Sequence, residues 1–187
     1  NNAMRGTTNT NITGGENVAI GAGTMKFNIS GERNVASGRS SLYTNTTGSD
    51  NAVIGYQSLF SNTTANYNTA IGNYSLYDAN RTSDTDGYNT ALGYNAGNTG
   101  TNDITTGNKN TLLGASTAAS AAAGTNQTVI GYGASGKGDN TVTIGNGDIT
   151  AWSAADAGQS ADWSFFCVSH ALVPAGRSRR HYGRRDA

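Results

Sequence analysis

Apolar residues in this chain recur as a short repeated phrase: one polar residue, a run of small or β-branched residues, and a closing glycine. The phrase occurs eight times, from residues 17–21 to residues 141–145, most often as Asn-Thr-Ala-Ile-Gly or a close variant. Successive closing glycines lie 17, 17, 17, 21, 21, 17 and 14 residues apart. Such a period is typical of solenoid proteins, in which each repeat buries its apolar surface against its neighbours.

The clearest repeats, in residues 34–65, predict the structure of one unit. Each phrase is followed by Ser-Leu-Tyr or Ser-Leu-Phe and then by Asn-Thr-Thr. Short apolar runs between Gly and Asn clusters indicate strands, and Asn-Thr-Thr-Gly is typical of a turn. The density of Gly, Asn and Thr and the lack of a 3.6-residue period argue against helix. We therefore expect an all-β solenoid of about eight coils of 14–21 residues, each with two short strands and two turns.

Equivalent positions of successive coils should stack about 4.8 Å apart and form continuous rows. We expect the residue before the closing glycine to face the coil's own core. This predicted core ladder comprises Ile20, Ile54, Ile71, Leu92, Leu113, Ile130 and Ile144. A second apolar row follows four residues after the glycine, at Met25, Leu42, Leu59 and Leu76, and is itself followed by the aromatic residues Tyr43, Phe60 and Tyr77.

Strand alternation gives the phrase a second face, which would point away from that core. A coil encloses only about three to five apolar side chains. Their burial, at roughly 1.5–3 kcal/mol each, hardly offsets about 1–2 kcal/mol of backbone entropy per residue. Small apolar residues on the second face suit a neighbouring chain, and cyclic association would bury them. The predicted interchain face comprises Ala19, Ala36, Val53, Ala70 and Ala91. The alternative is a single-chain solenoid.

Composition limits the classes of function. Apolar residues make up 35% of the chain, which would favour disorder without the periodic phrase. The formal net charge is zero, so no basic surface for nucleic acid is expected. The chain also has no apolar run of about 18–20 residues, so membrane insertion is not expected. The single cysteine, Cys167, excludes an intrachain disulfide.

A composition boundary lies near residue 151. Residues 1–150 contain all 23 Asn and all 25 Thr, and residues 151–187 contain none of either. We therefore predict a repeat domain over residues 1–150 and a C-terminal segment of foreign composition over residues 151–187. That segment is either a short assembly foot or the product of a shifted reading frame.

The repeated Asn-Thr-Ala-Ile-Gly, Ser-Leu-Tyr and Asn-Thr-Thr-Gly elements of residues 12–150 resemble the head repeats of trimeric autotransporter adhesins. They resemble still more closely the related repeats of bacteriophage tail-fibre and tailspike proteins. The resemblance implies a left-handed β-roll, three copies of which pack into an obligate homotrimer. It also implies a role in attachment to a cell surface or, in a phage, to the host.

From the repeats and this resemblance we expect a structural attachment protein: a fibre shaft or head that adheres a virion to its host, located on the virion tail or at an extracellular surface. The receptor would be a glycan or a protein. Alternatives are the head of a bacterial surface adhesin and a self-assembling extracellular filament subunit. We do not expect an enzyme or a cofactor, because no acid–base pair, metal cluster or nucleophile recurs at a fixed place.

The two 21-residue intervals mark insertions, and insertions on one face of a solenoid are common binding sites. The candidate binding loops contain Asp84 and Asp86 in the first and Asn102 and Asp103 in the second. Paired acids could bind calcium or attack a glycoside. The alternative is an ordinary solvated loop.

Two further patterns in the sequence carry no functional prediction. Residues 131–136 match G-x-G-x-x-G, but Gly138 stands where a phosphate-binding loop needs Ser or Thr. Seven Asn-x-Ser/Thr sites are explained by the repeated Asn-Thr-Thr turn, although glycosylation is the alternative.

Overall fold

The computed structural model describes residues 13–82 and 86–149. The chain divides into two units, residues 1–150 and residues 151–187, and the second unit lies outside the described residues. The predicted nature of residues 151–187 therefore stays a prediction.

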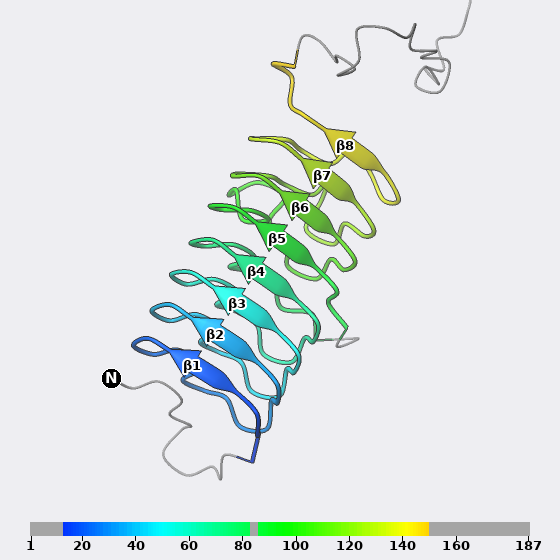
Figure 1. The fold of residues 1–187 in the computed structure, drawn as a ribbon. Helices are drawn as coiled ribbons and strands as arrows, with labels where there is room; N and C mark the ends of the chain where they lie inside the picture. The colour runs from blue at the N-terminus through cyan, green and yellow to red at the C-terminus, as the bar shows by residue number, and fades with distance from the viewer. Residues whose placement is uncertain (1–12, 83–85, 150–187) are drawn as a thin grey trace, which may run out of the picture. The chain divides into compact units, whose positions relative to one another are not determined.

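The described residues form a parallel β-solenoid, which confirms the predicted fold class (Figure 1). One strand of each coil joins a single eight-stranded sheet, in which every strand pairs in parallel with the next along the chain. About seven turns of about 17 residues connect the strands, and the described residues contain no helix. The strands are β1 (Val18–Ile20), β2 (Val35–Ser37), β3 (Ala52–Ile54), β4 (Thr69–Ile71), β5 (Thr90–Leu92), β6 (Thr111–Leu113), β7 (Thr128–Ile130) and β8 (Val142–Ile144).

The prediction of two strands per coil is wrong, because the far side of each coil turns too sharply for a strand. Leu42 and Leu59 have φ of +49° and +47°, in the left-handed region. The far sides still stack through backbone hydrogen bonds: the Leu42 N–H donates to the Ser58 carbonyl at 3.0 Å, and the Leu59 N–H to the Ser75 carbonyl at 2.9 Å. Left-handed leucines are uncommon and give no sequence signal of their own.

The closing glycine of each phrase is required by the stacking of the coils. Gly38 has φ of +135°, and a Cβ placed on it would lie 2.3 Å from the carbonyl oxygen of Gly55 in the next coil. Any side chain would therefore separate the two coils at the corner where the strand ends.

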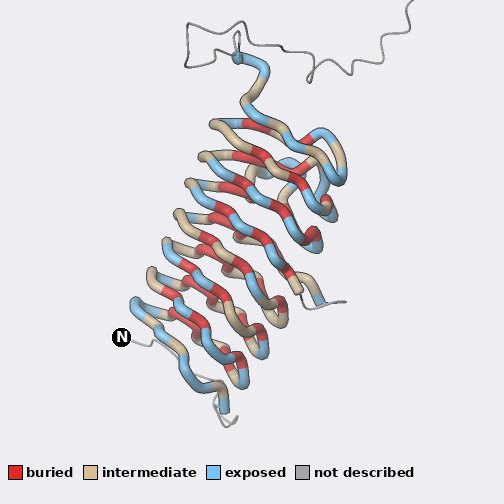
Figure 2. Tube along the Cα trace, turned by 45° about the vertical axis from the view of Figure 1, so that its right-hand side comes forward, coloured by how far each residue is buried: buried red, intermediate tan, exposed pale blue. Residues whose placement is uncertain are grey.

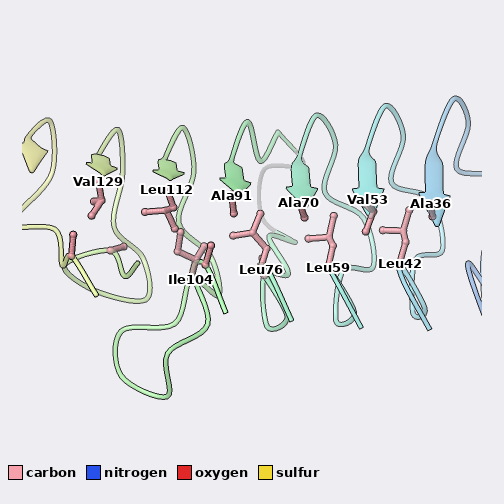
Figure 3. Close-up of a cluster of buried hydrophobic side chains, with 14 of the residues drawn as sticks. Ala36, Leu42, Val53, Leu59, Ala70, Leu76, Ala91, Ile104, Leu112 and Val129 are labelled. Carbon is pink, nitrogen blue, oxygen red and sulfur yellow. The ribbon is translucent and has the colours of Figure 1, made fainter. Parts of the chain in front are cut away.

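The core lies between the strands and the far side of the coils (Figures 2 and 3). Its strand side is made by the middle residue of each strand, including Ala36, Val53, Ala70, Ala91, Leu112 and Val129. Figure 3 shows these side chains directed toward Leu42, Leu59, Leu76 and Ile104 from the other side. All of these side chains have at most 1% of their surface exposed.

The two predicted faces of the strands are therefore exchanged. Ala36, Val53, Ala70 and Ala91 are buried in their own coil, and Ala19 is partly buried against the same core, so they cannot form an interchain face. The predicted core ladder points outward: Ile20, Ile54, Leu92, Leu113 and Ile144 are exposed, and Ile71 and Ile130 are half-exposed. The reason is space, because the leucines of the far side leave room for only small or medium residues at the strand centre.

The coil after β5 lacks the core leucine of the coils after β2, β3 and β4, and a residue of its own inserted loop replaces it. Gly97 occupies the position of Leu76, and the inserted loop instead brings Ile104 into the core. A Cβ on Gly97 would lie 2.8 Å from Leu76 Cδ2 and 3.0 Å from Leu112 Cδ1. The larger Leu112 and the inserted Ile104 therefore fill the volume that the missing leucine would occupy.

Buried asparagines before the strands form one ladder along the solenoid. Asn51 Oδ1 accepts from the backbone N–H of Asn68 at 2.9 Å and from the Asn68 side-chain amide at 3.1 Å. The Asn51 amide itself donates to the carbonyl of Ala65 at 3.0 Å. The same contact between successive coils joins Asn17, Asn34, Asn51, Asn68, Asn89, Asn110 and Gln127. This ladder explains why a polar residue opens the phrase.

A second ladder lies in the turns that begin Asn-Ile-Ser at residue 28 and Asn-Thr-Thr at residues 45 and 62. The Asn45 amide donates to Asn28 Oδ1 at 2.8 Å, and the Asn62 amide to Asn45 Oδ1 at 2.8 Å. All three asparagines are buried. In the folded coil these three Asn-x-Ser/Thr sites are therefore structural and closed to glycosylation.

Candidate binding surface

The outer face of the sheet carries exposed or half-exposed apolar side chains along all eight strands. We call it the outer sheet face; it consists of the first and third residues of β1 to β8. Ile20 is 61% exposed, Ile54 48% and Leu92 45%. None of the eight strands contains a charged residue. Exposed apolar surface of this continuity is typical of an interaction site.

The predicted aromatic row on the far side is confirmed. Tyr43 and Phe60 stack with ring centroids 4.9 Å apart and an interplanar angle of 8°, and Phe60 and Tyr77 stack at 5.1 Å and 7°. Phe27 meets Tyr43 edge-on at 5.1 Å. Lys26 Nζ donates to the Tyr43 hydroxyl at 3.0 Å. Because the stacked rings cover one another's faces, mainly their edges remain for contact.

A second aromatic group lies at the corner where each strand ends. The Tyr74 ring stands nearly perpendicular to Tyr56 at 5.2 Å and to Tyr94 at 6.3 Å. Burial raises the pKa of Tyr74, and the nearby Tyr56 hydroxyl adds to this effect. The Arg39 guanidinium lies 5.8 Å from the centre of the Tyr56 ring.

The opposite corner, before each strand, is partly charged. Arg33 forms a two-pronged ion pair with Asp50, with Nε–Oδ1 at 2.7 Å and Nη2–Oδ2 at 2.9 Å, and also contacts Glu32 at 3.0 Å. The hydrogen bond from Arg33 is the main cause that lowers the pKa of Asp50. Further along this corner Tyr67 and Tyr88 stack at 5.0 Å.

The predicted binding loops are only partly described. Asp84 lies outside the described residues, and Asp86 is half-buried and accepts from the Tyr88 hydroxyl at 3.3 Å. Asn102 is exposed with φ of +58°. Asp103 Oδ1 accepts from the backbone N–H groups of Thr99 and Gly100, so it closes its own loop. These contacts give Asp103 a structural role, and binding at the loops stays a prediction.

The charge of Asp103 also acts on the neighbouring coil. Burial raises the pKa of Asp78, and the negative charge of Asp103 raises it further.

Within residues 13–82 and 86–149, no three His, Cys, Asp or Glu side chains are grouped so that they could hold a metal ion. The same residues contain no helix long and apolar enough to cross a membrane.

The outer sheet face and the tyrosine corner were not recognised as contact surfaces from the sequence. For the outer face a signal was present: the third residue of the strand is Ile or Leu in seven of the eight strands, whereas the middle residue is Ala in four of them. Comparisons with family models, with curated proteins and with solved structures give no match to this chain. The resemblance to adhesin and tail-fibre repeats therefore rests on the repeated motifs alone.

Proposed function

We propose that this chain is a structural attachment protein, a segment of a homotrimeric fibre that holds a virion to the surface of its host cell. The observation that carries the proposal is the outer sheet face, which presents apolar side chains from all eight strands and no charge. In a fibre this face packs against the same face of two further copies around the long axis.

Energetics support an interchain role for the outer sheet face. Each exposed Ile or Leu has about half of its surface in water. Burial of that half contributes on the order of 1 kcal/mol per side chain. Seven of the eight strands carry an Ile or Leu on this face. Over three chains the sum is about 20 kcal/mol before the cost of association, more than the roughly 5–15 kcal/mol net stability of an ordinary domain. Three copies, rather than two, are what the resemblance to the adhesin heads implies.

The parallel register also suits symmetric association. Each strand pairs with the next without a shift, so Ile54 and Ile71 stand in one row along the solenoid. A straight row of equivalent residues can meet its own copies along its whole length. Contact with the host then falls to the corners and loops, which the association leaves at the periphery.

Sedimentation equilibrium of the full chain tests the assembly. We expect a trimer, and we expect the double substitution Ile54→Lys and Leu92→Lys to dissociate it, because two charges per chain would be buried in the interface. Thr47→Lys is the matched control, since Thr47 is exposed in a turn outside the sheet. A wild-type chain that is folded and monomeric at all concentrations contradicts the proposal.

A test of attachment uses the same samples. The wild-type trimer should bind whole host cells in a pull-down, and an excess of the trimer should block adsorption of the virus that carries it. A trimer that neither binds cells nor blocks adsorption would leave the chain a shaft without the proposed attachment role.

A further inference from the structure

At the corner after each strand, the backbones of successive coils pair residue by residue. This pairing determines which side chains lie above one another. The N–H of Tyr74 donates to the Tyr56 carbonyl at 2.9 Å, and the N–H of Ser116 to the Tyr94 carbonyl at 2.8 Å. The same bond joins Gly133 to Ala115 at 3.0 Å and Asn95 to Asn73 at 3.0 Å. The residues directly after the closing glycines of β3 to β7 are therefore stacked in the order Tyr56, Asn73, Tyr94, Ala115 and Tyr132.

Tyrosines occur in every second coil of this column, which leaves two gaps, each two coils high. The first gap lies between Tyr56 and Tyr94, and it is filled from within the chain. The Tyr74 ring is nearly perpendicular to both, at 5.2 Å and 6.3 Å. The protein itself thus shows that a gap of this height accommodates one six-membered ring.

The second gap lies between Tyr94 and Tyr132, and the chain places no ring at the position equivalent to Tyr74. Ser116 occupies that position, and Ala115 lies between the two tyrosines in the column. Tyr132 is 75% exposed, the largest fraction among the large hydrophobic side chains of the described residues, and Tyr94 is 54% exposed. Two coil spacings are about 9.6 Å. A ring stacked between two aromatic residues needs about 7–8 Å, so the gap has room for one ring, and a small lean of the exposed tyrosines brings both into contact with it.

We propose that this second gap, the Tyr94–Tyr132 notch, binds one pyranose ring of a neutral glycan. Tyrosine rings pack well against the C–H faces of a sugar, and their hydroxyls stay available for hydrogen bonds. Ser116 and Asn95, which follow Ala115 and Tyr94 in the sequence, add a hydroxyl and an amide to this corner, and none of Tyr94, Asn95, Ala115, Ser116 and Tyr132 is charged. An aromatic side chain of a protein partner would cover these polar groups without pairing them, which disfavours that ligand.

This inference rests on the proposed attachment function and deepens it, because it names the receptor chemistry as a saccharide. The test is saturation-transfer-difference NMR of the full chain with methyl glycosides of glucose, galactose, mannose and N-acetylglucosamine. N-acetyl-phenylalaninamide serves as the aromatic probe. At least one glycoside should bind with a Kd of about 1 mM, as expected for a ligand of about a dozen heavy atoms.

Two variants locate the binding at the notch. Tyr132→Ala removes one wall, and Ser116→Tyr fills the notch as Tyr74 fills the first gap. Ser116 and Tyr74 have φ of +55° and +60°, so the backbone at position 116 accommodates tyrosine. Each variant should weaken glycoside binding about tenfold or more. Tyr67→Ala is the control, because it removes an exposed tyrosine from the other corner and should leave the Kd unchanged.

The inference is overturned if no glycoside gives a signal, if Tyr132→Ala and Ser116→Tyr bind like the wild type, or if only N-acetyl-phenylalaninamide binds. Sedimentation of the same samples separates the two proposals. A trimer that binds cells but no glycoside refutes the notch and leaves the attachment function standing, whereas a monomer refutes the assembly itself.

Discussion

The inner and outer sides of the same strands use apolar residues in opposite ways. On the inner side, Ala36 and Val53 are small or medium and fully buried between the strand and the leucines of the far side. On the outer side, Ile54 and Leu92 are large and nearly half exposed. Hydrophobicity therefore does not distinguish the inner from the outer side of a strand. Where a leucine fills the far side of the coil, side-chain size does, because little room is left at the centre of the strand.

This difference separates two properties that single substitutions can test independently. Inner residues should determine whether each chain folds, and outer residues should determine whether folded chains associate. Neighbouring positions of one strand allow the comparison with almost no change of sequence context.

The largest expected effect comes from a charge placed on the inner side. Val53→Asp should destabilise the chain by about 4 kcal/mol or more, because it buries a carboxylate without a partner. Ile54→Asp, one residue further on, should leave the fold in place and weaken the association. Circular dichroism during thermal unfolding, combined with sedimentation, measures both effects. Equal loss of folding in the two variants would contradict the assignment of the faces.

Truncation of the far side of the core comes next. Leu59→Ala should cost about 2–5 kcal/mol, since it opens a cavity between two stacked leucines. Ile104→Ala should cost a similar amount, because Ile104 fills the space beside Gly97. Urea titrations of both variants check this, and a negligible effect of Ile104→Ala would show that the long coil does not contribute to the core.

A smaller effect is expected from the asparagine ladder. Asn51→Ala should cost about 1–3 kcal/mol, because the Asn68 N–H and amide lose their buried acceptor. Asn126→Ala is the control, since the side chain of Asn126 is exposed and its amide donates to the exposed Asn140 side chain. Hydrogen exchange at Asn68 gives a local readout, and unchanged protection there would exclude the ladder as a source of stability.

The smallest effect concerns the exposed ion pair of Arg33 and Asp50. The folded pKa of Asp50 lies below its ordinary value, so the pair stabilises the fold above the unfolded pKa of Asp50. That contribution disappears as the pH falls through the lowered pKa. Because the pair is open to solvent, the decrease in stability on protonation of Asp50 should be small, and it should be smaller still in high salt. Thermal unfolding of the wild type and of Asp50→Asn between pH 2 and pH 7 measures it; a salt-independent difference would contradict this account.

Much of the fold was predictable because the repeat period determines the number and length of the coils. The spacing of the glycines gives the coils, and the position of the leucines gives the second apolar row and the stacked Tyr43, Phe60 and Tyr77. The assignment of the strand faces was not predictable from alternation, which defines two faces without saying which is inside. That choice depends on the volume left by Leu42 and Leu59, and their left-handed backbone is set by contacts between coils.

The candidate surfaces were harder to predict for the same reason. The tyrosine column combines residues at successive corners, so it emerges only when the register of the coils is known. The substitution of Gly97 for leucine coincides with the insertion that supplies Ile104, and this pairing could have been recognised from the sequence. The loops containing Asp86 and Asp103 were found from interval length, but their contacts were not.

The central claim is that the outer sheet face joins copies of this chain. It is tested most directly by cross-linking Ile54→Cys, in a Cys167→Ser background, with a short bismaleimide. Thr47→Cys in the same background is the control. The account predicts covalently joined chains for Ile54→Cys and only single chains for Thr47→Cys. Single chains for Ile54→Cys, or joined chains for Thr47→Cys alone, would contradict it.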